Sequence, residues 1–300
     1  MHVKAKSRSD IWLDTWINVI LISFCLLCIL PVMMTVSISL MSEADIFEQG
    51  YQLIVRDVNW DSYKYLFQYP ERMLEAYKTT IIVTVCGTVV SVLMTALIAY
   101  PLSRMDFAYR RYINFFVFFT MLFSGGLVAS YILTANWLNL KDTLWALILP
   151  SLAAPFHIFL MRIFFQGLPD SLVEAARIDG MSEFRIFATI VVPLCKQAFA
   201  TIGLLTALGY WNEAFLPMLY IDDPKLTTLQ LMLKNLVEYV NLIKTDALRT
   251  ASGGSFSVID LPSDGVMFAT VVVASAPMLF IFAFFQKYFV KGIMTGAIKG

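Results

Sequence analysis

The sequence predicts an all-α integral membrane protein with six transmembrane helices. Of its 300 residues, 59% are hydrophobic and 15% are charged, and the mean hydropathy is +0.72. Soluble domains have about 45–50% apolar and about 25% charged residues. Uncharged stretches of about 20 residues recur along the chain, which is the length a helix needs to cross a bilayer. In lipid, the backbone hydrogen bonds must be made within helices or within a closed β-barrel. The alternation of apolar and polar residues that is typical of barrel strands is absent, which indicates helices.

The spans follow from the uncharged stretches, taken in chain order. Five stretches contain no charged residue, and a sixth, from about 197 to 221, is interrupted only by Glu213. We therefore expect one transmembrane domain over 1–300, with spans at about 15–40, 79–102, 112–135, 143–166, 190–220 and 266–287.

Basic residues set the expected orientation. They gather before the first span, between the second and third, between the fourth and fifth, and after the sixth, for example at Lys4, Arg104, Arg177 and Lys287. By the positive-inside rule, both termini and these connections lie in the cytoplasm. The long segments 42–76 and 222–264 then lie outside, and "TASGGSFS" (250–257) is a candidate contact for an external protein.

The connection after the fourth span is unusually charged for this chain. "SLVEAARIDGMSEFRIFATIVVPL" (171–194) contains Glu174, Arg177, Asp179 and Glu183. Ser171 and Glu174 have the spacing of a capping box, which predicts a short helix from Ser171. Gly180 is expected to end that helix in the left-handed conformation, and a second helix should begin near Ser182. Physically, the segment is either an elbow on the lipid headgroups or a docking surface for a cytosolic partner.

The same segment resembles the EAA loop of ATP-binding-cassette (ABC) importer permeases. The matching positions are Glu174, Ala175, Ala176, Asp179, Gly180, Ile190, Pro193 and Leu194, whereas Met181 and Gln197 depart from the family pattern. The resemblance implies that 170–189 holds the coupling helix, which fits a groove on the ATPase subunit. Residues 174–176, 179 and 180 are thus the predicted ATPase-coupling residues.

The resemblance covers nearly the whole chain from about Trp12. The segments 123–150, "GYWNEAFLPMLY" (209–220) and the tail "QKYFVKGIMTGAIKG" (286–300) are similar to the carbohydrate-uptake, MalG-like branch, and within it to LplC-type and alginate-importer permeases. It implies a type I importer transmembrane domain in the inner membrane of a prokaryote. Its implied partners are a homologous second permease, two ATPase subunits that bind ATP and Mg²⁺, and an extracytoplasmic solute-binding protein.

No enzymatic motif is found. The sequence has no phosphate-binding P-loop, no zinc-protease H-E-x-x-H and no nucleophile elbow, and its only histidines are His2 and His157. We expect no catalytic residue, metal site or cofactor in this chain. With 22 basic and 22 acidic residues, it also has no net charge that would favour nucleic acid.

Polar and aromatic residues within the spans are candidates for the substrate pathway, because such groups usually face a cavity or another helix. His157 either faces the cavity or bonds a neighbouring helix. Aromatic rings next to amides or carboxylates suit sugar recognition, but the same rings could form an interfacial belt. The candidates are Asn136, Trp137, His157, Tyr210, Trp211, Asn212 and Glu213.

The resemblance implies import of an oligosaccharide, with an acidic, uronide-containing one as an option. An anionic substrate would favour a donor-rich cavity; His157 agrees with this and Glu213 does not. Two alternatives stay open. The chain could be an ABC permease for a non-sugar solute, or a stand-alone secondary transporter, although the latter class usually shows inverted repeats and paired intramembrane acids.

Overall fold

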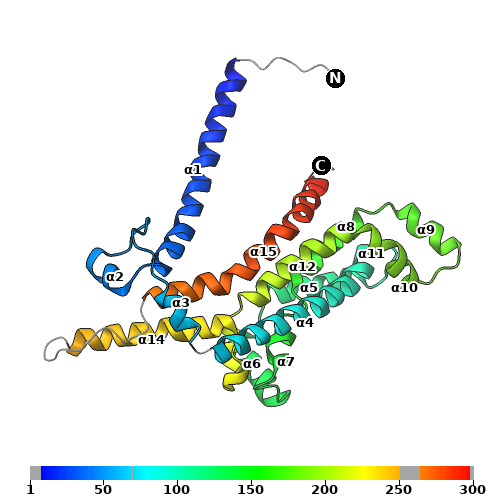
Figure 1. The fold of residues 1–300 in the computed structure, drawn as a ribbon. Helices are drawn as coiled ribbons and strands as arrows, with labels where there is room; N and C mark the ends of the chain where they lie inside the picture. The colour runs from blue at the N-terminus through cyan, green and yellow to red at the C-terminus, as the bar shows by residue number, and fades with distance from the viewer. Residues whose placement is uncertain (1–7, 69, 251–263, 298–300) are drawn as a thin grey trace. The chain divides into compact units, whose positions relative to one another are not determined.

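The computed structural model describes residues 8–68, 70–250 and 264–297, and all regular elements in these ranges are helices (Figure 1). The predicted all-α fold is therefore confirmed for this part of the chain. The candidate external contact at 250–257 lies outside it except for residue 250, and so do the side chains of the 286–300 tail.

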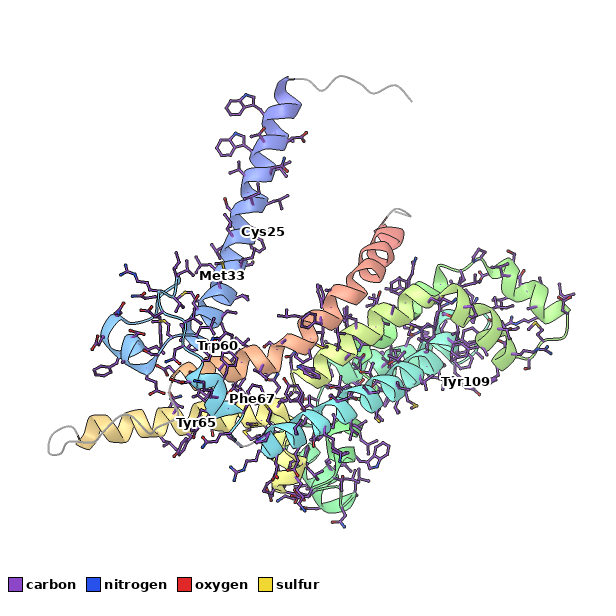
Figure 2. The ribbon with its side chains drawn as sticks, in the orientation of Figure 1. Cys25, Met33, Trp60, Tyr65, Phe67 and Tyr109 are labelled. Carbon is purple, nitrogen blue, oxygen red and sulfur yellow. The ribbon has the colours of Figure 1, made fainter. Side chains whose placement is uncertain are left out.

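Three spans are single long helices. They are α1 (Arg8–Ser39), α4 (Pro70–Ser103) and α15 (Asp264–Ala297), with apolar stretches at Trp12–Ser39, Pro70–Ser103 and Asp264–Ala283. From Trp16 to Met33, α1 has apolar residues on all sides and exposes its hydrophobic side chains, as Figure 2 shows around Cys25 and Met33. A helix with apolar side chains all round is typical of one that is surrounded by lipid.

The other three candidate spans are bent pairs of helices. The first joins α5 (Arg110–Leu122) to α6 (Gly126–Tyr131) and the π-helical η1 (Ile132–Trp137) at 114°. The second joins α7 (Leu144–Ile148) and η2 (Leu149–Ser151) to α8 (Pro155–Gln166) at 54°. The third joins α10 (Glu183–Ile186), η3 (Phe187–Val191) and α11 (Val192–Leu194) to α12 (Lys196–Trp211) at 81°.

These bends occur at residues that interrupt helices. Gly126 has a φ of +82° at the first break, Pro155 opens α8 at the second, and Pro193 lies just before the third. With each pair taken as one span, the described residues hold six candidate spans, which equals the number expected from the sequence. The fifth is shifted from the expected 190–220, since it begins at Glu183 and ends at Trp211.

The chain divides into two compact units, residues 1–70 with 235–275 and residues 71–234 with 276–300. The single domain expected over 1–300 stays a prediction. The first unit includes α2 (Glu43–Gln49), capped by Ser42, and α3 (Asp61–Leu66). Its exposed aromatic side chains include Trp60, Tyr65 and Phe67 (Figure 2).

The second unit contains the main hydrophobic core, where α4, α5, α8, α9 (Asp170–Ile178), α10 and α12 contribute side chains. Met161, Phe165, Ile186 and Ile202 are fully buried there. The unit also contains α13 (Phe215–Tyr220), η4 (Pro224–Leu226) and the beginning of α14 (Leu229–Thr250).

Small residues on α4 allow its neighbours to approach closely, as is common in membrane helices. At Gly87, the ring of Tyr210 packs directly against the α4 backbone. The Tyr210 hydroxyl lies 3.0 Å from the hydroxyl of Ser91 and donates a hydrogen bond of 3.0 Å to the carbonyl of Ile148. These contacts fix the position of the ring relative to α4 and α7.

Candidate functional site

The charged connection contains the short helix α9, which lies beyond the ends of α8 and α10 (Figure 1). It is nine residues long and begins at Asp170, with Pro169 at the N-cap. The predicted capping box is therefore wrong. Ser171 already lies within the first helical turn, and the N-cap position makes no side-chain hydrogen bond.

The end of α9 is as predicted. Gly180 has a φ of +76°, which costs glycine little. Its N–H donates to the carbonyl of Arg177, and the N–H of Met181 donates to the carbonyl of Ala176, both at 3.0 Å. This pair of bonds is a Schellman motif, and Met181 also packs against the main core. The turn therefore fixes the direction in which the chain leaves the helix.

Helix α9 has an inner and an outer face. Val173 and Ala176 are buried in the main core, 3% and 4% exposed. Among the predicted coupling residues, Glu174, Ala175, Asp179 and Gly180 are exposed, whereas Ala176 holds the helix to the core. The apolar side chains of Leu172 and Ile178 and, on α10, Phe184 are also exposed. The outer surface thus combines carboxylates with uncovered apolar groups.

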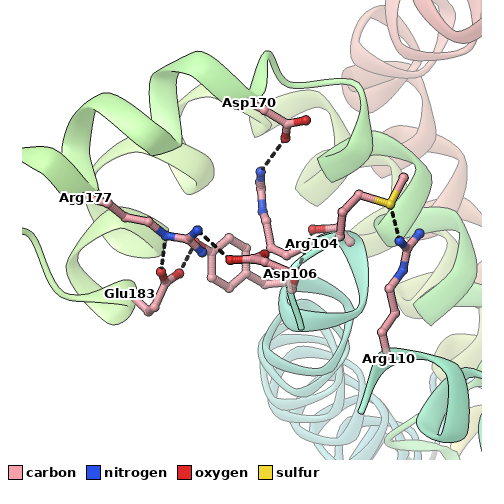
Figure 3. Close-up of polar contacts among 9 residues, drawn as sticks. Arg104, Asp106, Arg110, Asp170, Arg177 and Glu183 are labelled. Carbon is pink, nitrogen blue, oxygen red and sulfur yellow. Dashed lines mark hydrogen bonds and ion pairs between the residues drawn. The ribbon is translucent and has the colours of Figure 1, made fainter. Parts of the chain in front are cut away.

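Ion pairs lie at both ends of α9 (Figure 3). Arg177 Nη1 lies 2.5 Å from Asp106 Oδ2, and Arg177 Nε lies 2.6 Å from Glu183 Oε1. The two carboxylates, Glu183 first, raise the pKa of Arg177, and Arg177 in turn lowers the pKa of Asp106. At the other end of the helix, Arg104 Nη1 lies 3.4 Å from Asp170 Oδ1.

A cavity of about 490 Å³ lies beside these ion pairs, between the end of α4, residues 104–107, α9 and α10. Arg104 lines it and is buried, with its guanidinium carbon 5.2 Å from the ring centroid of Tyr100. Its Nε and Nη2 are buried without a hydrogen-bond partner among the described residues. The walls contain two arginines, Arg104 and Arg177, and two carboxylates, Asp106 and Glu183, so the cavity has no excess of positive charge.

The structure does not gather the predicted pathway residues into one site. Tyr210 and Trp211 are buried in two different clusters of the second unit, 6% and 3% exposed. His157 Nδ1 lies 3.3 Å from the hydroxyl of Thr206, so this histidine contacts the neighbouring helix α12. Both rings and the histidine thus take part in packing within the chain.

The remaining candidates lie at or beyond helix ends. Asn136 and Trp137 are exposed in η1, and Trp137 is 80% exposed. Asn212 is exposed and donates to the carbonyl of Leu208. Glu213 Oε1 accepts hydrogen bonds from the backbone N–H groups of residues 215 and 216, at 2.8 and 3.1 Å, so its carboxylate caps α13.

Arg104, Asp106 and Asp170 were missed as members of a site. The sequence signal was available, because charges are scarce and a basic and an acidic residue flank Met105 directly after a span. What the sequence could not supply is the pairing, since Asp106 and Arg177 are 71 positions apart.

The apolar helices, with a short exposed helix between two of the spans, define a multi-span integral membrane protein. The chain belongs to the family of binding-protein-dependent transport system inner membrane components, whose profile matches residues 87–295. It is therefore a transport subunit of a multi-component import system.

Similar proteins agree with this family. The polygalacturonan/rhamnogalacturonan transport system permease protein YtcP of Bacillus subtilis is 35% identical, over 96% of this chain and 98% of that protein. Protein LplC of the same organism is 36% identical, over 91% of this chain and 90% of that protein. Among solved structures, a chain of a bacterial ABC transporter that imports the acidic polysaccharide alginate matches with a TM-score of 0.80 and 29% identity, over 96% of this chain and 100% of that one.

Proposed function

We propose that this chain is the permease subunit of an ABC importer for oligosaccharides that contain uronic acid units. One observation supports the choice of cargo. This chain is similar over nearly its full length to a polygalacturonan/rhamnogalacturonan transport system permease and to a chain of a transporter involved in import of the acidic polysaccharide alginate. Families of transporters retain a fold more readily than a cargo, so the substrate class rests on these relatives and needs its own test.

The complete importer contains a second, homologous permease, two ATPase subunits that bind ATP and Mg²⁺, and an extracytoplasmic solute-binding protein. It lies in the cytoplasmic membrane of a prokaryote with both termini of this chain in the cytoplasm, an orientation that the distribution of basic residues favours. Helix α9 then faces the cytoplasm. Its outer surface, with Glu174 and the 86% exposed Ile178, contacts the ATPase.

The substrate pathway in this chain is formed mainly by the exposed candidates. Asn136, Trp137 and Asn212 can offer an aromatic face and amide groups to a sugar. Tyr210, Trp211 and His157 stabilise the walls through their contacts within the chain. Glu213 does not contact the sugar but caps the N-terminal end of α13.

The cargo is tested by ATP hydrolysis in the complete complex, reconstituted in liposomes with its binding protein. Matched oligogalacturonates and neutral oligogalactosides of equal length are added, and the increase in hydrolysis is measured. We expect at least a fivefold stimulation by the acidic series and little by the neutral one. Stimulation by the neutral series alone would contradict the choice of an acidic cargo. Stimulation by neither series would indicate that the importer transports a different solute.

A further inference from the structure

Residues 104–106, directly after α4, contact both ends of α9 with pairs of opposite polarity (Figure 3). At the beginning of α9, Arg104 lies 3.4 Å from Asp170; near its end, Asp106 lies 2.5 Å from Arg177. The two α9 residues are seven positions apart, which is about 10 Å along a helix. We call these two ion pairs the two-ended clamp.

Two contacts constrain a helix differently from one. A single ion pair fixes a point and leaves the helix free to pivot about it, whereas pairs at both ends also fix the direction of the axis. The reversed polarity prevents an exchange of partners, because Arg104 would repel Arg177 and Asp106 would repel Asp170. The clamp therefore allows one orientation of α9 relative to the end of α4.

The Asp106–Arg177 pair contributes little to stability. Its side chains are 57% and 36% exposed, and exposed ion pairs contribute about 0–1 kcal/mol. Arg104 is buried, but its contact with the 78% exposed side chain of Asp170 is long, at 3.4 Å. Helix α9 is already held by Val173 and Ala176 in the core and by its terminal turn. The helix macrodipole would favour Asp170 at the beginning and Arg177 at the end without any partner. Matching partners at both ends therefore indicate a role in orientation.

The clamp also connects α9 to a helix that is not its neighbour in the chain. Along the backbone, α9 follows α8 and precedes α10, so a movement of α9 reaches the fourth and fifth spans directly. It has no such link to α4, whose residues precede it by more than sixty positions. The two helices share the main core, and the hydroxyl of Tyr100 on α4 donates a hydrogen bond of 2.8 Å to Glu183 on α10. The clamp adds a direct polar link to both ends of α9, and α4 in turn packs against Tyr210 of α12 through Gly87 and Ser91.

We propose that the four residues of the clamp, Arg104, Asp106, Asp170 and Arg177, are positioning residues that make α4 follow α9 when the ATPase subunits move. This inference rests on the proposed docking of α9 on the ATPase. The clamp turns a displacement of one short helix into a concerted movement of three spans. Without it, the ATPase still moves α9, but α4 lags and the pathway opens incompletely.

The decisive variant is Asp106→Ala, compared with Asp106→Glu, which keeps the charge. Complete complexes in liposomes are assayed for binding-protein-stimulated ATP hydrolysis and for sugar uptake. In Asp106→Ala we expect uptake per ATP hydrolysed to fall at least threefold while the amount of assembled complex is unchanged, and Asp106→Glu to recover at least half. The double variant with Arg177→Gln should be no worse than Arg177→Gln alone, because that single variant already removes the contact with Asp106 together with the one to Glu183.

Two comparison variants separate the clamp from the proposed docking. Arg111→Gln removes an exposed charge near the same end of the bundle and should leave the ratio unchanged. Glu174→Lys, on the outer face of α9, should reduce both hydrolysis and uptake if α9 docks on the ATPase. A normal ratio in Asp106→Ala alongside a defect in Glu174→Lys would overturn the clamp alone, whereas normal behaviour of Glu174→Lys would count against the docking. Loss of assembled complex in Asp106→Ala in proportion to uptake would also overturn the clamp, by making it a folding contact.

Discussion

Replacing Gly87 with alanine tests the close contact between α4 and α12. A Cβ at position 87 would lie 2.8 Å from Cε2 and Cζ of Tyr210, whereas carbon atoms in contact prefer about 3.5–4.0 Å. The ring would thus have to move by about 0.7 Å or more. It is not free to do so, because its hydroxyl bonds Ser91 and the carbonyl of Ile148.

Three effects set the size of the loss. Overpacking of a well-packed site costs about 1–3 kcal/mol. Alanine is better than glycine within a helix by about 0.5–1 kcal/mol, which offsets part of that cost. A displaced ring would weaken at least one Tyr210 hydrogen bond, whose net contribution is about 1 kcal/mol. We therefore expect Gly87→Ala to lower the free energy of unfolding by about 1–3 kcal/mol.

The measurement is reversible unfolding of the full chain in mixed micelles, titrated with SDS and followed by circular dichroism. Gly209→Ala is the matched control, since a Cβ there meets no atom within 4 Å and should leave stability equal or slightly higher. In a Tyr210→Phe background the ring can move, so the Gly87→Ala loss should shrink. Equal unfolding midpoints for Gly87→Ala and Gly209→Ala would refute the steric argument.

Two further predictions concern connections between spans. Gly180 has a positive φ and open space around it. Gly180→Val should therefore strain the backbone and reduce uptake several-fold, whereas Gly180→Asn should retain most of the uptake, because asparagine tolerates this conformation. Equal uptake by the two variants would argue against a conformational role. Asp142 accepts backbone hydrogen bonds from Asp222 and Asp223 at 2.6 and 2.9 Å, and these N–H groups, that of Asp223 first, lower its pKa. Its folded pKa is depressed, so its stabilising effect is present above the unfolded pKa of about 3.9 and is lost as the pH falls through the folded value. The protection factors of the Asp222 and Asp223 amides, which correct for the intrinsic slowing of hydrogen exchange in acid, should fall in that range, and in Asp142→Ala they should be low already at neutral pH. Equal protection factors in Asp142→Ala and the unchanged chain would show that this contact does not order the segment.

Much of the fold follows from local sequence properties. Bilayer crossing depends on the hydropathy of about 20 consecutive residues, so the number of candidate spans can be read without tertiary information. The end of α9 was equally predictable, because Gly180 meets a backbone requirement set by its immediate neighbours. The beginning of α9 was not, because proline and aspartate before Ser171 compete with the capping box for the first turn.

The candidate site depended more on tertiary structure. A tyrosine near the end of a span suits a lipid-interface belt and a buried hydrogen-bonded core equally well, and only the approach of α4 decides the position of Tyr210. The charges of the clamp could be counted from the sequence, but their pairing across about 70 positions could not. The bends at Gly126 and Pro155 had visible signals, yet their angles follow from packing.

The capping role of Glu213 bears on attempts to redesign cargo preference. Because Glu213 is a carboxylate close to Tyr210 and Trp211, it is an obvious position to substitute in order to change the preference for acidic sugars. Its oxygen is already committed to the backbone of α13, so Glu213→Lys would first release the beginning of that helix, and any change in preference would be mixed with the loss. Trp137, which is 80% exposed, is the safer starting position for a directed library.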